Sequence, residues 1–203
     1  MRKGPEMDLQ LTGKRALVSA GHQGIGRFVA TRLLEEGASV AICCRRADAL
    51  EAAVADLSEL GTAVGSVCDF TDVEAIRRWV AESAESLGGI DICVGNASAS
   101  GQRGEGPAPW QANYEVDILG SAMFYEAAKP FLDESDAAAI VQIATITAIE
   151  HHDVPISPSY GASKAATINL VAQLAQRWGS AGIRANTVSP GPILIEDGRW
   201  DDI

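Results

Sequence analysis

Short apolar runs alternate with longer amphipathic stretches along this sequence, and that alternation restricts the possible folds more than any other feature. The apolar runs occupy residues 14–20, 39–44, 63–68, 91–95, 138–145 and 183–189. They are apolar at most positions instead of at every second one, which is typical of strands buried on both faces. The pattern therefore predicts a parallel sheet covered by helices on each side.

Five amphipathic stretches, at 24–36, 48–60, 72–86, about 110–131 and about 158–178, are the expected helices. Thr71 followed by Glu74 predicts a capping box at the third, and Pro158 is suited to the first turn of the last. Gly37 and Gly61 are expected to end the first two helices in the left-handed conformation. The predicted fold class is α/β, a doubly wound parallel sheet with helices on both faces.

Length and charge exclude several classes of protein. With 203 residues the chain is expected to form one domain. The formal charge of −11 is spread over the helical stretches, so we expect no nucleic-acid partner. No apolar run approaches the roughly 18 residues of a membrane span, and the opening residues lack a signal-peptide core. We therefore expect a cytoplasmic protein without a membrane partner.

The cysteines and histidines do not suggest a metal site. Four cysteines lie within or at the ends of apolar runs without CxxC spacing and are expected to be buried, reduced thiols: Cys43, Cys44, Cys68 and Cys93. His151, His152 and Asp153 are interpreted as an exposed loop at a pocket rim. Three tryptophans are expected to be packing residues: Trp79, Trp110 and Trp178.

A glycine-rich turn follows the first apolar run. Residues 19–27 read SAGHQGIGR, and the first expected helix begins within them. Glycines between a strand and a helix N-terminus let the backbone approach a pyrophosphate and direct free N–H groups at it, so Gly24 and Gly26 are the informative pair. The alternative is a tight turn that binds no ligand.

The turn resembles the TGxxxGIG fingerprint of the short-chain dehydrogenase/reductase family, with Ser19 and Ala20 in place of Thr and the first Gly. The resemblance, closest to the 3-oxoacyl-ACP-reductase-like branch, continues through CDFTD at 68–72, VGNAS at 94–98 and NTVSPG at 186–191. It implies a Rossmann fold and a nicotinamide dinucleotide cofactor. The cofactor-binding residues it implies are Ala20, His22, Gln23, Gly24, Ile25, Gly26, Asp69, Phe70, Asn96, Ala97, Pro190, Gly191 and Ile193.

The segment YGASK places Tyr160 and Lys164 four residues apart, on one face of an expected helix. An ammonium beside a phenol favours the phenolate and adapts it to acid–base work. In the resembling family the tyrosine exchanges a proton with the substrate oxygen, and the lysine lowers the pKa of the tyrosine and holds the nicotinamide ribose. The alternative is an ordinary surface pair on an amphipathic helix.

Two further positions resemble the family with changes. Thr145 stands where a serine in the family usually hydrogen-bonds the substrate oxygen, and it is the predicted residue for this role. A different alignment register would select Thr147 instead. The alternative is that the threonine serves only the β-propensity of the strand. Asp117 replaces an asparagine whose backbone carbonyl holds a water leading to the lysine. A carboxylate there could also pair with Lys164 and moderate its effect on Tyr160.

The end of the second apolar run bears on cofactor choice. Enzymes selective for NAD place a carboxylate there, whereas this sequence has Cys44 followed by Arg45 and Arg46. Two guanidiniums can bind a 2′-phosphate, with His22 as a further donor. We expect a preference for NADP(H), with NAD(H) possible as a substitute; solvated surface charges are the alternative.

The sequence thus predicts an NADP(H)-dependent oxidoreductase that interconverts a carbonyl and a secondary alcohol, with a small molecule as substrate. Its rivals are a non-catalytic dinucleotide sensor and a structural subunit. The family resemblance also implies that the 203 residues lack a C-terminal substrate helix and a last strand. We expect a homo-oligomer, a dimer or tetramer, because uncovered sheet edges promote association.

Overall fold

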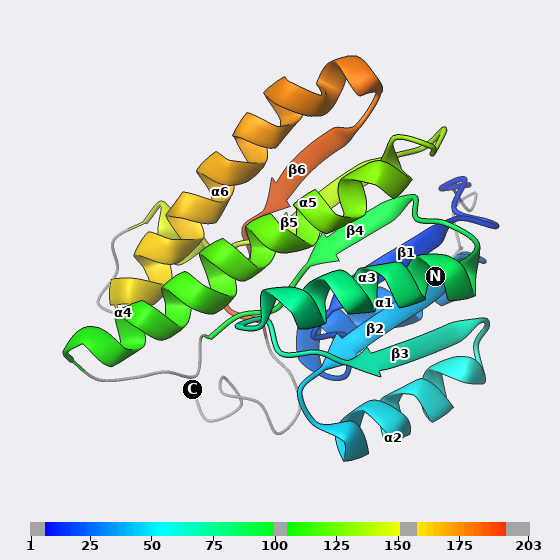
Figure 1. Cartoon of the computed structure of the whole chain (residues 1–203), viewed down its shortest axis with the longest axis horizontal. Helices are drawn as coiled ribbons and strands as arrows, with labels where there is room; N and C mark the ends of the chain where they lie inside the picture. Colours follow the sequence, from blue (N-terminus) through cyan, green and yellow to red (C-terminus); the bar gives the residue numbers. More distant parts are fainter. Residues whose placement is uncertain (1–6, 100–104, 151–157, 194–203) are drawn as a thin grey trace, which may run out of the picture.

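The computed structural model describes residues 7–99, 105–150 and 158–193. Its centre is one six-stranded parallel sheet in the order β3-β2-β1-β4-β5-β6 (Figure 1). The strands are β1 (Arg15–Ser19), β2 (Ser39–Cys44), β3 (Ala63–Val67), β4 (Ile92–Gly95), β5 (Ala139–Ile143) and β6 (Arg184–Val188). This arrangement confirms the predicted fold class.

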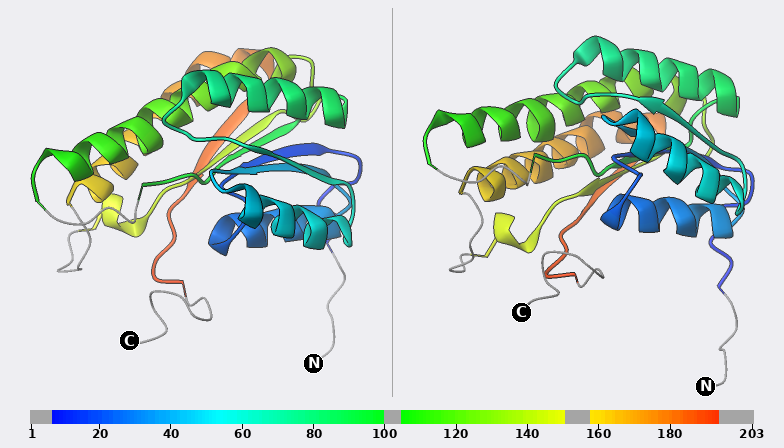
Figure 2. Two further views of the ribbon diagram at one scale, coloured as in Figure 1. Left: turned by 60° about the horizontal axis from the view of Figure 1, so that its bottom comes forward. Right: turned by 90° about the horizontal axis from the view of Figure 1, so that it is seen from below.

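Helices connect the strands and cover the sheet in two layers. They are α1 (Gly24–Glu35), α2 (Ala47–Ser58), α3 (Val73–Leu87), α4 (Pro107–Asn113), α5 (Ser121–Leu132) and α6 (Pro158–Trp178), with a π-helical segment η1 (Tyr114–Gly120) and 3₁₀ turns η2 (Ile146–Ala148) and η3 (Gly179–Ala181). Figure 2 shows α1 and α2 on one side of the sheet and α3, α5 and α6 on the other. Each layer buries its own apolar cluster, because successive strand residues point to opposite faces.

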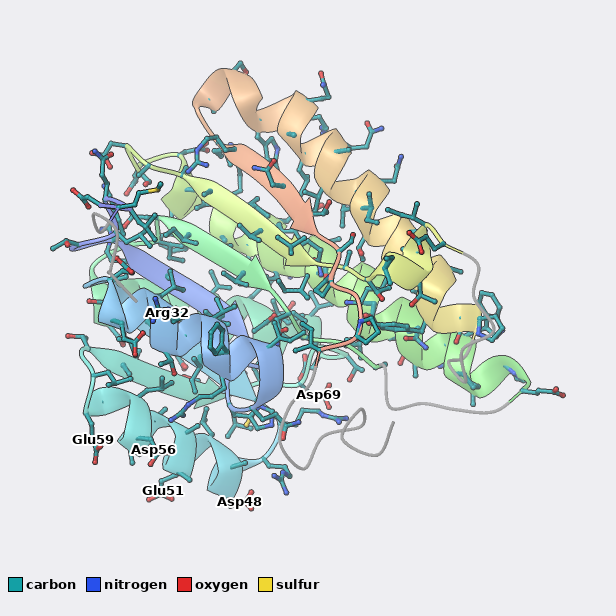
Figure 3. The ribbon with its side chains drawn as sticks, turned by 180° about the vertical axis from the view of Figure 1, so that it is seen from behind. Arg32, Asp48, Glu51, Asp56, Glu59 and Asp69 are labelled. Atoms are coloured by element: carbon teal, nitrogen blue, oxygen red, sulfur yellow. The ribbon has the colours of Figure 1, made fainter. Side chains whose placement is uncertain are left out.

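Acidic side chains line the outer surface of α2. Figure 3 shows Asp48, Glu51, Asp56 and Glu59 along the exposed side of α2. The negative charge of this helix therefore lies on solvated surface. No helix in the described ranges is long and apolar enough to cross a bilayer.

The helix ends differ from two of the sequence predictions. Asp72, not Thr71, caps α3: its carboxylate accepts hydrogen bonds from the backbone N–H groups of Glu74 and Ala75. Thr71 instead bonds to the preceding loop, since its N–H and its hydroxyl both donate to Asp69 Oδ1, each at 2.9 Å. Gly37 has the expected positive φ of 83°.

Gly61 does not adopt the left-handed conformation that was predicted for it, since the second helix already ends at Ser58 in a right-handed turn. The expected helix at 110–131 is a longer run from Pro107 to Leu132, with η1 inserted in its middle. The fifth strand ends at Ile143, earlier than predicted, because the chain turns into η2 after Thr145.

The tryptophans divide between core and surface. Trp79 is 1% exposed and stacks on Phe124 with ring centroids 5.2 Å apart. Trp178 packs against the same cluster, with Lys129 Nζ 5.5 Å from its ring centroid. Trp110 is 52% exposed, so its predicted packing role is wrong: the buried positions of α4 are Pro109 and Asn113, which turns Trp110 outward.

Candidate functional site

Three positions in and after the turn that follows β1 require glycine, each for a different physical reason. Gly24 has a positive φ of 55° at the start of α1. A Cβ on Gly26 would lie 2.5 Å from both the Ala20 carbonyl oxygen and Asn96 Nδ2, so only glycine allows this approach. A Cβ on Gly21 would lie 2.5 Å from Ile42 Cγ2. The sequence interpretation did not single out Gly21, because its constraint comes from a neighbouring strand.

Ala20, which stands in place of the first glycine of the family fingerprint, has a strained backbone conformation. Its φ is +50°, in the left-handed region where a Cβ is unfavourable. The alanine therefore keeps the turn conformation that glycine would adopt without strain.

Asn96, which follows β4, binds this turn through side-chain hydrogen bonds. Its side-chain amide donates to the carbonyls of Ser19 and Ala20 at 3.1 and 3.2 Å. In return, Ser19 Oγ accepts the N–H groups of Asn96 and Ala97 at 2.8 and 2.9 Å. Asn96 thus positions the turn through the backbone of β1, where the carboxyl ends of parallel strands form the usual ligand crevice.

A cavity of about 490 Å³ opens beside the turn, at the carboxyl ends of the strands, and this volume is typical of small-molecule sites. Among the residues predicted to bind cofactor, its lining includes Ala20, His22, Gln23, Arg45, Arg46, Asp69, Phe70 and Ala97. The lining also includes Cys43, Cys44, Cys68, Thr71, Ser98, Ala99, Ala112, Glu115 and Val116. The sequence interpretation did not assign this second group, because its members gather only when the strand ends meet.

Three nitrogen-bearing side chains gather at one side of the cavity. Arg45 and Arg46 are exposed, and His22 is half-buried with Nδ1 lacking a hydrogen-bond partner among the described residues. Burial, and then the charges of Arg46 and Arg45, lower the pKa of His22 below its usual 6.5. A buried ring nitrogen without a partner beside two cations is suited to an anionic group of a ligand when that nitrogen carries the proton.

Three of the four cysteines line the cavity: Cys43, Cys44 and Cys68. All four cysteines are buried and free, as predicted. Burial, with the neighbouring Cys68, raises the pKa of Cys43 well above its usual value, so this thiol is protonated at neutral pH. Cys44 stands where NAD-selective proteins have a carboxylate, and its Sγ donates to the Arg46 carbonyl at 3.1 Å. The wall of the cavity is therefore neutral at this position.

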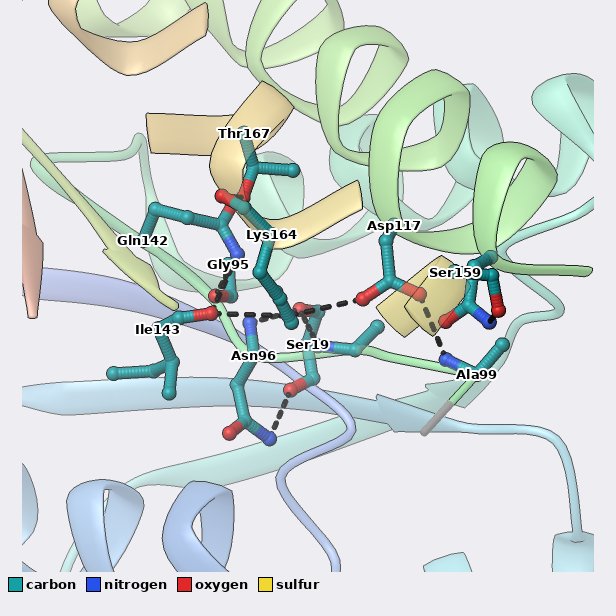
Figure 4. A network of polar contacts seen from close by, with 12 residues as sticks. Ser19, Gly95, Asn96, Ala99, Asp117, Gln142, Ile143, Ser159, Lys164 and Thr167 are labelled. Carbon is teal, nitrogen blue, oxygen red and sulfur yellow. Dashed lines mark hydrogen bonds and ion pairs between the residues drawn. The ribbon is translucent and has the colours of Figure 1, made fainter. Parts of the chain in front are cut away.

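Tyr160 and Lys164 lie in the first turns of α6, and neither belongs to the lining of that cavity. Lys164 is buried, with Nζ 5.9 Å from the centroid of the Tyr160 ring. Its ammonium donates to the Ile143 carbonyl at 3.0 Å (Figure 4). Asn113 Nδ2 donates at 3.1 Å to Ser159 Oγ, which holds the start of α6 against α4. Lys164 is connected to the cavity through Asp117, which pairs with Lys164 and accepts the N–H of Ala99, a lining residue; the cavity and the Tyr160–Lys164 pair are together called the strand-end crevice below.

Asp117 is completely buried in η1 and faces the same lysine (Figure 4). Its Oδ1 lies 3.0 Å from Lys164 Nζ, an ion pair whose angles fall outside hydrogen-bond geometry, so Oδ1 accepts no hydrogen bond from the described residues. Its Oδ2 accepts the N–H of Ala99 at 3.0 Å. π-Helical turns of this kind are frequent at functional sites, because the widened turn redirects side chains.

The two threonine hydroxyls lie together, 3.0 Å apart, with Thr145 Oγ1 also accepting the N–H of Thr147 at 3.3 Å. They do so within η2 and its cap, not on one face of a strand as the sequence suggested. A Cβ on Gly161 would lie 3.0 Å from the Thr147 carbonyl oxygen, which places η2 against the turn of α6 that follows Tyr160.

The PG segment reaches the same region. The Pro190 carbonyl accepts the N–H of Ile146 at 3.0 Å, and Gly191 and Ile193 follow as exposed residues. His151, His152 and Asp153 lie outside the described residues. In the described ranges no three His, Cys, Asp or Glu side chains are grouped as a metal site would require.

The chain matches known proteins over nearly its whole length. Residues 14–197 match the family model described as short chain dehydrogenase. The isoepoxydon dehydrogenase patN of Penicillium expansum is 33% identical over 195 residues, which cover 94% of this chain and 74% of the relative. These matches confirm the resemblance to the family without distinguishing its 3-oxoacyl-ACP-reductase-like branch.

Solved structures agree with this match. A short chain dehydrogenase from Burkholderia cenocepacia, crystallised in complex with NADP, is 34% identical with a TM-score of 0.86, covering 95% of this chain and 81% of the other. An NAD⁺-bound xylitol dehydrogenase is 28% identical with a TM-score of 0.84, covering 90% and 71%. Structural relatives therefore include complexes with either dinucleotide.

Proposed function

The chain belongs to the short-chain dehydrogenase family and is an NAD(P)-dependent oxidoreductase, and from this premise we propose that it uses NADP(H) to interconvert a small carbonyl compound and a secondary alcohol. In this proposal Tyr160 and Lys164 are the acid–base pair. The observation that carries it is the buried ammonium of Lys164, held by the Ile143 carbonyl with Nζ 5.9 Å from the centroid of the Tyr160 ring.

The strand-end crevice suits a dinucleotide. Gly21 and Gly26 let the turn pack closely against Ile42, Ala20 and Asn96, and the turn leads into the N-terminus of α1, where free N–H groups can face a pyrophosphate. The unpartnered His22 Nδ1, with Arg45 and Arg46, suits the extra phosphate of NADP(H). Asp69, Phe70 and Ala97 would line the adenosine end, while Pro190, Gly191 and Ile193 would adjoin the nicotinamide end. When bound, the dinucleotide supplies or accepts the hydride.

The protein itself moves the proton. The Tyr160 hydroxyl exchanges a proton with the substrate oxygen, and the nearby ammonium favours its ionised form. Thr145 would hold the substrate oxygen with its hydroxyl, which is kept in place by Thr147. Lys164 is the residue that would also hold the nicotinamide ribose.

Incubating the full chain with NADPH and a panel of ketones tests this proposal, with NADPH oxidation followed by absorbance. Turnover is the expected result. Tight NADPH binding without turnover of any ketone or of the corresponding alcohols would instead support the sensor alternative. The absence of both binding and turnover would support the structural subunit.

We also propose a cytoplasmic homo-oligomer, a dimer or tetramer. The four free cysteines suit a reducing compartment. Large apolar side chains are half-exposed on α4, η1 and β6, at Trp110, Tyr114 and Val188, and could be covered by a second copy. Light scattering coupled to size exclusion measures the mass; a monomer at micromolar concentration would contradict the oligomer.

A further inference from the structure

The Asp117 carboxylate is a departure from the family pattern, in which an asparagine usually stands at this position. Asp117 and Lys164 are 0% and 2% exposed, so the two charges are screened little by water. The other Asp117 oxygen is held by the Ala99 N–H at 3.0 Å, which fixes the carboxylate between η1 and the segment after β4 (Figure 4).

The ammonium is fixed from its other side by a buried polar network. The Ile143 carbonyl accepts hydrogen bonds from both Lys164 Nζ and Gln142 Nε2, each at 3.0 Å. Gln142 Nε2 also donates to the Gly95 carbonyl at 2.9 Å, and its Oε1 accepts the Tyr125 hydroxyl at 2.7 Å. A Cβ at Gly95 would overlap Tyr125 and Gln142, so the network depends on glycine there. Lys164 is therefore held between one carbonyl and one carboxylate.

Few other charges face this pair within the described ranges. Neither α4, β5 nor η2 contains an ionisable side chain, and the exposed Glu150 follows η2. On η1, Glu115 lines the cavity and accepts a hydrogen bond from Gln111 Nε2 at 2.8 Å. On β6, Arg184 is exposed at the first position. Asp117 is thus the buried carboxylate in contact with the lysine.

We infer that Asp117 is a positioning residue that holds Lys164 and sets the pH at which Tyr160 ionises, by offsetting the field of the ammonium at the phenol. The inference rests on the proposed roles of Tyr160 and Lys164. An asparagine at this position would leave the ammonium without an opposing charge, whereas the aspartate makes the phenolate less favourable. The working range of this enzyme therefore lies at higher pH than Tyr160 and Lys164 alone would give.

The test observes Tyr160 directly. The chain has three tyrosines, so ¹³Cζ-tyrosine NMR gives few signals, and Tyr160→Phe assigns the relevant one. In Asp117→Asn we expect the Tyr160 titration midpoint to fall by about half to one pH unit, the size of shift that removing one opposing charge beyond direct contact gives at an intermediate dielectric. Glu126→Gln, which removes an exposed charge from α5, is the matched control and should leave the midpoint unchanged.

The acid limb of kcat/KM for alcohol oxidation should move with the NMR midpoint. An unchanged midpoint in Asp117→Asn, or one displaced to higher pH, would overturn the inference. Near-UV circular dichroism verifies that the variant is folded; if it is not, Asp117→Ser removes the same charge from a smaller side chain and makes the same comparison. If the Tyr160 midpoint falls in Asp117→Asn but the wild-type protein turns over no substrate, the proposed function alone is rejected. If the wild-type protein turns over substrate normally but the midpoint does not change in Asp117→Asn, only the role of Asp117 is rejected.

Discussion

Arg15 and Asp91 join the first residue of β1 to the residue before β4 through two parallel charge-assisted hydrogen bonds, Nε to Oδ2 and Nη2 to Oδ1, each 2.8 Å. The Asp91 carboxylate also accepts the Arg15 N–H and the Ser135 hydroxyl. This cluster lies at the amino ends of the strands, opposite the candidate site, and its role is structural.

The first prediction concerns stability in acid. Burial alone would raise the pKa of Asp91, but hydrogen bonds from Arg15 and Ser135 outweigh it and lower the pKa from 3.8 to about 2. The resulting stabilisation, roughly 2 kcal/mol, is fully present above pH 3.8 and is lost as the pH falls through about 2. Asp91→Asn should lose that amount at pH 7, measured by urea unfolding, and the difference from wild type should shrink below pH 4. Asp136→Asn, at an exposed pair with Lys14, is the control; an equal loss there would contradict the assignment.

The second prediction concerns the strained turn. Ala20→Gly removes the strain of a positive φ, which costs the folded state about 1 kcal/mol. Glycine also gives the unfolded chain more conformational entropy, which lowers the free energy of unfolding by a similar amount. We expect unchanged or slightly increased stability to heat, and unchanged or tighter NADPH binding. Ala30→Gly, in the interior of α1, should destabilise by about 1 kcal/mol. Equal losses from both changes would show that the conformation at position 20 carries no strain.

The third prediction isolates the proton-transfer step. Tyr160→Phe should reduce kcat roughly 10³-fold while the Kd for NADPH stays unchanged, because only the hydroxyl is removed. Lys164→Ala should reduce kcat and also weaken NADPH binding. It also leaves Asp117 buried without its partner, so unfolding must be measured alongside. Comparable turnover in Tyr160→Phe would remove the basis of the mechanism.

The fourth prediction compares the two threonines. Thr145→Val should reduce kcat/KM more than Thr147→Val, since each change removes one hydroxyl at nearly constant shape. Because the hydroxyls are 3.0 Å apart, Thr147→Val should also have a measurable effect through the orientation of its neighbour. The reverse order would identify Thr147 as the residue that holds the substrate oxygen.

The fifth prediction concerns cofactor choice and its pH dependence. Arg45→Ala and Arg46→Ala should each reduce the preference for NADPH over NADH, by about tenfold for a lost charge-assisted hydrogen bond. The lowered pKa leaves His22 neutral in the free protein at neutral pH, and a bound phosphate would raise it again. NADPH affinity should therefore rise as the pH falls from 7 towards 5.5, and His22→Gln should remove that rise. A wild-type preference for NADH would refute the assignment of this loop.

Local chemistry was sufficient for much of this structure. The apolar runs predicted each strand and the amphipathic stretches each long helix, because burial on a sheet depends on residue periodicity. One error is also local in origin: Asp72 instead of Thr71 caps α3, while the N–H and the hydroxyl of Thr71 both donate to Asp69. Competition among neighbouring side chains of similar capping ability is not decided by residue type.

The sequence by itself determined the fold class, the glycine turn and the Tyr160–Lys164 spacing, since each depends on residues close together in the chain. Only the tertiary structure decided that Gly21 lies against Ile42, that Asn96 donates into β1, and that Asp117 pairs with Lys164. These contacts join segments far apart in the sequence. They exist because the parallel sheet brings the carboxyl ends of its strands to one edge, where packing and not local preference selects the neighbours.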